Sequence, residues 1–388
     1  MAKKQKIKHA VDYYKSAIEY AKDTNEVPVL CIHVYNTKGL DGPLDQPSAW
    51  SALVKGTGIS HKTGVGSLGA FGHGSKAPFS YSRVRSVFYY TKVKKSAKIT
   101  EERFQGKSIL QTHECPHTSN LTQATGFYGE IDGAKPLIDE KVPSWAKEFR
   151  KKVTEDTGTS VYVPFTQYRE DLFPETRITI IANFFYAIYS GVLEVTVGKT
   201  EINETNVQAV YRDCVKMLDT EQDDIDVAHI KNCFETVETI IRADHKNTQR
   251  IPGFGEIQWY LRLNEDLEKR VGISRSSGML ITRKAPFLEK FPNIKPFDMF
   301  VCVIDQDGSE ILKRLENPTH DNFEFDRITS EAERQSIKRQ YRNFQKKIRD
   351  LLEQYAAVEV EEEESVTGLS GLFGEVSDAD QGHSKLFE

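Results

Sequence analysis

The spacing of apolar positions changes along the chain between a helical and an alternating period, which predicts a mixed α+β protein. Residues 177–189 (RITIIANFFYAIY) are apolar all round, which is typical of a buried helix. Residues 330–357 are predicted to form a long, strongly charged helix, and residues 106–135 to form loops and short strands. The other predicted helices span residues 8–25, 49–54, 144–154, 203–217 and 226–243. The predicted strands span residues 27–35, 82–91, 159–165, 192–197, 258–263, 278–281 and 299–304.

Length and composition indicate an ordinary protein of two domains, or three. The chain has 388 residues, and no apolar run approaches the roughly 20 residues of a membrane span. The basic N-terminus has no apolar core behind it, so we predict no secretory signal. The five cysteines lie far apart without a CxxC pair, which favours free thiols in a reducing cytoplasm. We therefore expect a cytoplasmic protein without a membrane partner.

The charge is unevenly distributed. Residues 358–388 hold nine acidic residues and one lysine, so the formal net charge of −5 conceals a body near +3. We expect this acidic, glycine- and serine-biased tail to be disordered. Residues 92–98 and 338–347 are basic and could contact nucleic acid phosphates, but solvated faces on a hairpin and a helix are the favoured explanation.

Residues 56–79 (GTGISHKTGVGSLGAFGHGSKAPF) hold seven glycines in twenty-four residues. Glycine lets a ligand approach the main chain closely, and unpaired N–H groups in such a loop suit phosphate oxygens. The serines and lysines of the segment can add hydrogen bonds and charge. We therefore predict a lid that binds the phosphates of a nucleotide.

Two familiar phosphate motifs fit this segment poorly. Gly64-x-Gly66-x-x-Gly69 has dinucleotide or kinase spacing, but no strand is predicted before it, and no HRD or DFG sequence follows. Gly69 and Gly74 have the spacing of a Walker A loop, but Lys76 comes one place late.

A third pattern fits better and carries a family resemblance. Gly69-x-x-Gly72-x-Gly74 follows a Ser60-x-Lys62 lead-in and precedes a helix start at residues 75–79. This resembles the second nucleotide motif of the GHKL or Bergerat-fold ATPases, the family of gyrase B, MutL proteins, histidine kinases and heat-shock chaperones. The turn of residues 36–40 (NTKGL) and the start of residues 158–160 (GTS) resemble two further family motifs and follow in the family's order.

A longer likeness points to one branch of that family. Residues 183–188, 191–195, 275–281 and 316–321 look like the bacterial MORC-like ATPases found beside restriction or phage-defence genes. The resemblance implies ATP and Mg2+ as cofactors, with a basic residue of a second domain on the γ-phosphate, for which Arg275, Arg283 and Lys284 are candidates. The nucleotide-binding residues that it implies are Asn36, Gly39, Ser60, Lys62, Gly66, Gly69, Gly72, His73, Gly74, Ser75, Lys76 and Thr159.

The chain departs from the family pattern at its catalytic helix. Active members carry a Glu and an Asn four residues apart, where the Glu activates water and the Asn holds magnesium. The nearest match is Glu19 with Asp23, and Val34 stands near the place of the adenine-binding aspartate. Asp41 downstream could substitute, or it belongs to a turn. Either the chain starts downstream of the catalytic helix, or it is a degenerate member of the family.

The remaining polar clusters do not predict a metal site. His113-Glu-Cys115-Pro-His117 could bind a metal, but zinc takes four ligands and no second pair stands out. His61 and His73 flank the lid and could donate to phosphate or simply pack. We predict no resident metal beyond the nucleotide's magnesium.

These observations predict an α+β protein in consecutive parts. Residues 1–190 would be a Bergerat-type sandwich, 191–330 a left-handed βαβ transducer domain, 331–357 a charged helix and 358–388 a disordered tail. The expected function is an ATP-binding conformational switch, with slow hydrolysis if a catalytic helix is supplied, in bacterial DNA processing or antiviral defence, acting as a homodimer with DNA or a partner protein. The alternative is an adaptor of the same fold that does not hydrolyse ATP, and a kinase-like phosphotransferase is a third.

Overall fold

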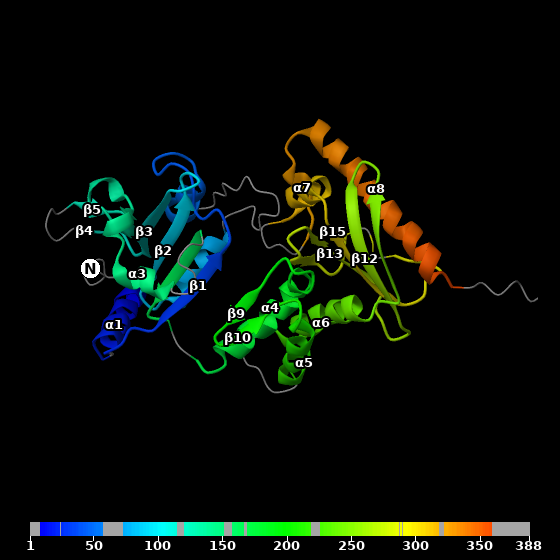
Figure 1. The fold of residues 1–388 in the computed structure, drawn as a ribbon, viewed down its shortest axis with the longest axis horizontal. Coiled ribbons are helices and arrows are strands. Elements are labelled where there is room, and N and C mark those ends of the chain that lie inside the picture. The colour runs from blue at the N-terminus through cyan, green and yellow to red at the C-terminus, as the bar shows by residue number, and fades with distance from the viewer. Residues whose placement is uncertain are drawn as a thin grey trace, which may run out of the picture.

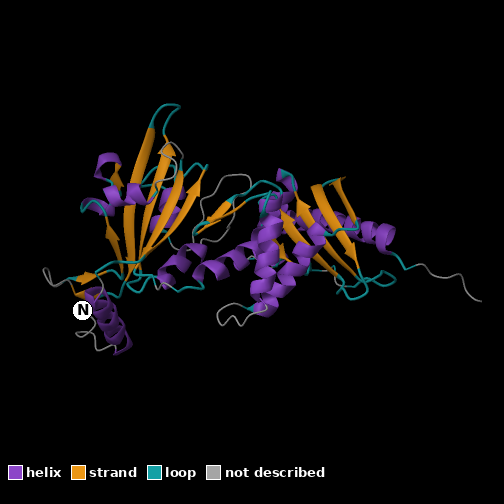
Figure 2. Ribbon diagram, turned by 60° about the horizontal axis from the view of Figure 1, so that its bottom comes forward, coloured by secondary structure: helices purple, strands orange, loops and turns teal. Residues whose placement is uncertain are grey.

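The computed structural model describes residues 8–23, 25–56, 73–114, 120–150, 157–166, 169–218, 226–286, 288, 290–317 and 322–358. Two β-sheets lie in separate lobes, each with helices packed on it (Figure 1). Figure 2 shows the same two sheets from another side, with a group of helices beside the second. The expected α+β class, with a sandwich lobe followed by a second sheet and a long C-terminal helix, is confirmed.

The first lobe is built on a six-stranded antiparallel sheet in the order β1-β8-β2-β3-β6, with β7 also pairing with β3. Its strands are β1 (Val29–Tyr35), β2 (Ser86–Lys94), β3 (Thr100–Ile109), β6 (Thr125–Tyr128), β7 (Leu137–Ile138) and β8 (Gly158–Pro164). A small separate ladder joins β4 (His113–Glu114) to β5 (Leu121–Thr122).

Side chains alternate between the two faces of this sheet, and each face has its own core. On one face, Trp50 and the short helices η1 (Ser51–Lys55) and α2 (Ala77–Tyr81) cover Val87 and Tyr89. On the other, α3 (Ser144–Phe149) packs Ala146 against Tyr90, Phe104 and Tyr162. The remaining elements of this lobe are α1 (Lys8–Asp23), η2 (His73–Lys76), η3 (Asp132–Ala134) and η4 (Asp139–Lys141).

The second lobe is a sheet between two helical layers. Its sheet has the order β11-β12-β15-β13-β14, and only β13 and β15 run parallel. The strands are β11 (His245–Ile251), β12 (Gly255–Leu263), β13 (Arg270–Arg275), β14 (Leu280–Thr282) and β15 (Phe297–Val303), and a hairpin of β9 (Val195–Val197) and β10 (Thr200–Ile202) precedes them. All of β15 is buried, because helices pack on both of its faces.

The two helical layers have separate cores. The first holds α4 (Leu172–Tyr189), α5 (Val207–Leu218) and α6 (Val227–Ile241), which pack on Tyr260 and Phe300. The second holds α7 (Gln306–Leu315), η5 (Phe325–Arg327) and α8 (Glu331–Ala356). In α8, Tyr341 and Phe344 belong to the sheet's core, whereas the basic residues around them are mostly exposed.

These cores bear on the expected domain boundaries. We expected the first domain to end at residue 190, but Ile178, Ile181 and Phe185 of α4 lie in one core with α5 and α6. We also expected α8 to stand apart, but it shares a core with β12 and β15. We therefore propose a division before α4 and a second domain that includes α8, and the tail beyond Val358 lies outside the described residues.

Two buried ion pairs strengthen the second sheet. Arg270 and Asp298 are direct register partners on β13 and β15, and Nε lies 2.7 Å from Oδ2. Arg275, at the end of β13, binds Glu316 just after α7, with Nε 2.9 Å from Oε2 and both residues at most 1% exposed. Each pair joins strands or helices distant in sequence, so both charges are compensated inside the fold.

We predict that Arg275→Ala lowers the free energy of unfolding by about 3–5 kcal/mol, because it leaves the Glu316 carboxylate buried without its partner. The control is Arg242→Ala, which removes an i,i+4 pair between an exposed arginine and the half-buried Glu238 and should cost about 0–1 kcal/mol. Urea unfolding of both variants measures the difference. Equal costs would contradict a structural role for Arg275.

Candidate functional site

The turn after β1 has two residues in the left-handed region of backbone space. Asn36 has φ of +55° and Gly39 has φ of +70°. Asparagine tolerates this region better than most residues, and glycine tolerates it freely. A Cβ on Gly39 would lie 2.7 Å from Thr91 Oγ1 and 2.8 Å from the Lys92 carbonyl, so the position also requires glycine sterically. The turn is thus fixed by local sequence and by its contact with β2.

Thr91 on β2 joins this turn to the start of β8. Its Oγ1 accepts a hydrogen bond from the Leu40 N–H at 2.8 Å and donates to the Gly158 carbonyl at 2.8 Å. Thr159 Oγ1 lies 3.3 Å from Thr91 Oγ1. The structure therefore brings Gly39 and Thr159 close together, and the sequence resemblance had assigned both to one nucleotide site. Thr91, which connects them, was not among the residues predicted from the sequence.

On the opposite face, Arg150 holds β1 and β8 together. Its guanidinium donates to Ser160 Oγ at 2.8 Å and to the Val34 carbonyl at 3.2 Å, and it stacks on Tyr35 at 4.5 Å. His33 Nδ1 lies 2.9 Å from the same Ser160 Oγ. Burial, and then the charge of Arg150, lower the pKa of His33.

The face that carries Thr159 is left open over β1. Because His33 and Tyr35 point to the Arg150 side, the alternating Ile32 and Val34 point to the Thr159 side. Ile32 is 44% exposed and Val34 48% exposed. An apolar shelf therefore adjoins the Asn36–Leu40 turn.

A buried lysine lies where the described ends of the glycine-rich segment meet the sheet. Lys107 on β3 is 7% exposed, and its Nζ donates to the Gly56 carbonyl at 3.4 Å. Burial lowers the pKa of Lys107, and the nearby charge of Lys76 lowers it further. In the described part of the chain, neither ammonium has a carboxylate partner. Two cations thus lie close together in a position that favours an anion.

The other predicted lid residues divide into two groups. Gly74, Ser75 and Lys76 form η2 with the backbone of His73, directly before α2. Lys76 is exposed, as is Gly74. The rest of the predicted set, namely Ser60, Lys62, Gly66, Gly69 and Gly72, lies outside the described residues.

The candidates for catalysis have different surroundings from those expected. Glu19 and Asp23 are exposed on α1, which contacts the β1-start end of the sheet through Tyr20 and Phe165. Arg275 is buried against Glu316, so it does not fit a side chain that reaches for a phosphate. Lys284 is exposed, lies 3.6 Å from Glu268 and lines a pocket of the second lobe.

Metal ligands do not gather among the described residues, where no group of three or more His, Cys, Asp and Glu side chains is placed to hold an ion. Cys115 and His117 of the His113 segment fall outside that part of the chain. The helices described in the structure include none with the length and apolar character needed to cross a bilayer.

Comparison with solved structures shows a distant structural likeness. No protein-family profile matches the sequence, and no curated protein matches it. Among solved structures, the chain is similar to the ATPase region of Saccharomyces cerevisiae topoisomerase II, with a TM-score of 0.31 and 11% identity. The match covers 70% of this chain and 63% of that one, so it spans less than two thirds of that structure. Similarity at this level does not establish a family.

We predict that Gly39→Ala destabilises the protein by roughly 1–3 kcal/mol, because alanine is strained at this φ and its Cβ collides with Thr91. Gly74→Ala is the matched control, since a Cβ there meets no described atom within 4 Å. It should change the free energy of unfolding by less than about 0.5 kcal/mol. Thermal unfolding of the two variants tests this, and a tolerated Gly39→Ala would exclude the tight turn.

The lowered pKa of His33 predicts a loss of stability in acid. The unfolded imidazole, with a pKa of about 6.5, binds protons more readily than the folded one, so folding stability is present above about pH 6.5 and declines as the pH falls below it. His33→Gln should flatten this decline. Melting temperatures of both proteins at about pH 7.5 and about pH 5.5 measure it, and parallel curves would rule out His33 as a source.

Proposed function

We propose that this protein is an ATP-binding conformational switch whose nucleotide lies on the face of the first sheet that carries Lys107 and Thr159. The observation that carries the proposal is Lys107, a buried lysine beside Lys76 and the Gly56 carbonyl. Burying an ammonium near a second cation costs free energy unless an anion offsets it. Because this pair flanks a glycine-rich segment, the anion best suited to it is a phosphate chain.

The turn of residues 36–40 supplies the other end of such a site. It sits beside the exposed Ile32 and Val34, which offer a flat apolar surface to a purine ring. Thr159 and the exposed Asn36 add polar groups at its edge. This combination, apolar contact with a few fixed polar groups, is typical of pockets for small ligands.

The spacing of the two ends favours a nucleotide over free phosphate. Lys107 pairs with Val87, and Thr159 pairs with Thr91, on the same face and four residues further along β2. Four residues of a strand span about 13 Å. The Trp50–Phe79 cluster covers the sheet between them, so a ligand that reaches both ends would lie over that cluster.

The described residues include groups suited to the phosphates of ATP, but they do not include a set of ligands suited to its magnesium ion. Lys107 and Lys76 would hold the phosphates, and the binding of these anions to the two cations would be the event that drives the switch. No described acidic cluster suits Mg2+, and Glu19 is exposed, so we derive no hydrolytic step through a metal. A homodimer, and a place in bacterial DNA processing or antiviral defence, remain part of the proposal through sequence resemblance alone.

We predict that Lys107→Met weakens ATP binding about 10- to 100-fold, the worth of one charge-assisted hydrogen bond. Methionine keeps the apolar stem and removes a buried charge, so the variant should unfold at the wild-type temperature or above it when no nucleotide is present. Lys94→Ala, at an exposed strand end, is the control and should bind as wild type does. Titration with ATP, with and without magnesium, measures all three.

The alternative is an adaptor of the same fold that binds protein or nucleic acid and does not use ATP. The exposed positions of Glu19 and Asp23 favour it over an active ATPase. A wild-type protein that binds no ATP at millimolar concentration would refute the switch and leave the adaptor. ATP binding that Lys107→Met does not weaken would refute the phosphate position proposed here.

A further inference from the structure

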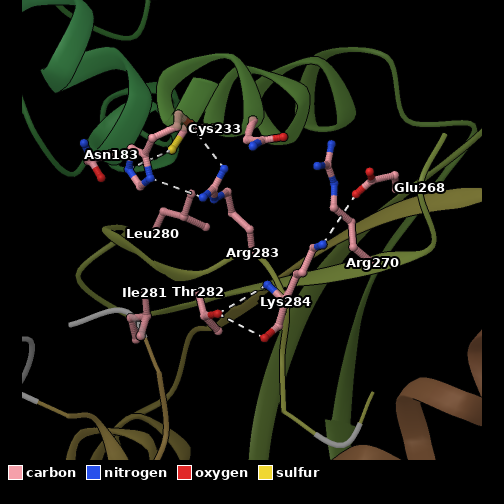
Figure 3. A pocket seen from close by; sticks show the side chains of 11 residues that line it. Asn183, Cys233, Glu268, Arg270, Leu280, Ile281, Thr282, Arg283 and Lys284 are labelled. Atoms are coloured by element: carbon pink, nitrogen blue, oxygen red, sulfur yellow. Dashed lines mark hydrogen bonds and ion pairs between the residues drawn. The ribbon is translucent and has the colours of Figure 1, made fainter. Parts of the chain in front are cut away.

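The second lobe contains a pocket of about 490 Å³ between α6 and the strands β13 and β14 (Figure 3). It is lined by Asn183 of α4, by His229, Asn232 and Cys233 of α6, and by Glu268, Arg270 and residues 280–284 of the sheet side. None of these residues belongs to the nucleotide site proposed in the first lobe. The pocket is large enough for a small organic molecule.

Three cations line this pocket, and Glu268 is the one carboxylate among the lining residues. Figure 3 shows Arg270, Arg283 and Lys284 extending from the sheet side toward α6, with Glu268 beside them. Glu268 lies 3.6 Å from Lys284, and both side chains are 70% exposed, so this pair is weak. Because Asp298 compensates the charge of Arg270, the excess positive charge of the pocket comes from Arg283 and the weakly paired Lys284.

The two arginines differ in how they are held. Arg270 is 5% exposed, and its Nε binds Asp298, while no described residue accepts a hydrogen bond from its two Nη groups. Arg283 donates from Nη1 to the His229 carbonyl at 3.2 Å, and its Nη2 lies 3.2 Å from His229 Nδ1. Asp298 fixes the orientation of Arg270, and the first turn of α6 fixes that of Arg283. Neither arrangement uses the full donor capacity of a guanidinium.

The other residues that line the pocket indicate the chemical character of the rest of the ligand. Asn183 and Asn232 offer amides, while Leu280, Ile281 and Cys233 offer apolar surface. Arginine recognises phosphate through paired, parallel hydrogen bonds, and amides suit hydroxyl groups. A concave pocket of this size suits a compact ligand rather than a nucleic acid strand.

We propose that this pocket binds a small organic phosphate, with its phosphate at Arg270 and Arg283 and its polar body toward Asn183 and Asn232. Lys284 at the rim adds charge that attracts the anion. The proposal is independent of ATP binding in the first lobe, because the two sites share no residue.

The test is calorimetric titration of the full chain with inorganic phosphate and with ribose 5-phosphate. Both should bind, and ribose 5-phosphate should bind more tightly because it also reaches the amides. Arg283→Ala should weaken both by at least about tenfold, the worth of a charge-assisted hydrogen bond. Arg242→Ala, at the exposed residue that follows the last turn of α6, is the control and should leave both affinities unchanged.

Four results would overturn the proposal. Arg283→Ala could bind phosphate as tightly as wild type, or only Lys107→Met could lose binding, which would assign the anion to the first lobe. Ribose 5-phosphate could bind no more tightly than inorganic phosphate, which would remove the organic ligand. A single-stranded oligonucleotide could bind through Arg283 while ribose 5-phosphate does not, which would make the pocket part of a nucleic-acid surface. Thermal unfolding of each variant establishes that it is folded.

Discussion

The first lobe depends on the position of β8, which pairs with β1 on one side and with β2 on the other. The Thr91 hydroxyl on β2 connects these strands to the candidate site. One oxygen atom links the backbone of the 36–40 turn, the Gly158 carbonyl and the Thr159 hydroxyl. The Thr91 side chain is fully buried, so water does not compete for these bonds. Three segments far apart in sequence are thereby held in one register.

The second lobe depends instead on charge compensation inside a mixed sheet. The parallel pair β13–β15 carries an arginine at each end of β13, and each meets a carboxylate. Burial raises the pKa of Asp298 although Arg270 acts against this, which indicates how costly the carboxylate is there. The same Arg270 turns its outer nitrogens to the pocket beside α6. The phosphate site proposed there would thus share one side chain with the pairing that supports the sheet.

The sequence predicted those features whose signal is local. The 36–40 turn was predictable because a left-handed backbone needs asparagine or glycine at defined places, and α4 because its apolar run has helical length. Strand β3 (TEERFQGKSI) was not expected over its full length, because its polar side chains conceal the alternation although five consecutive residues are buried. Lys107 was not predicted as a site residue for this reason. From sequence alone, a lysine is expected at the surface, and only its neighbours in the fold show that it is buried.

The surroundings of Arg275 could not be predicted from the sequence for a related reason. Its partner Glu316 is forty-one residues away, so only the folded chain shows that the two charges meet. A basic residue near a family-like motif suggests a ligand contact, whereas burial and a carboxylate indicate support for the sheet. Arg283 and Lys284, which were indistinguishable from it by spacing, lie instead at a pocket.

β1 forms one edge of the first sheet, and this position affects the tendency of the protein to aggregate. Among the described strands, only β8 pairs with it, so its outer row of backbone N–H and C=O groups faces away from the sheet. Ile32 and Val34 add exposed apolar surface to the same strand. Strands of this kind promote edge-to-edge aggregation unless something covers them. Among the described strands of the first lobe, β1 therefore combines an unpaired backbone edge with exposed apolar side chains.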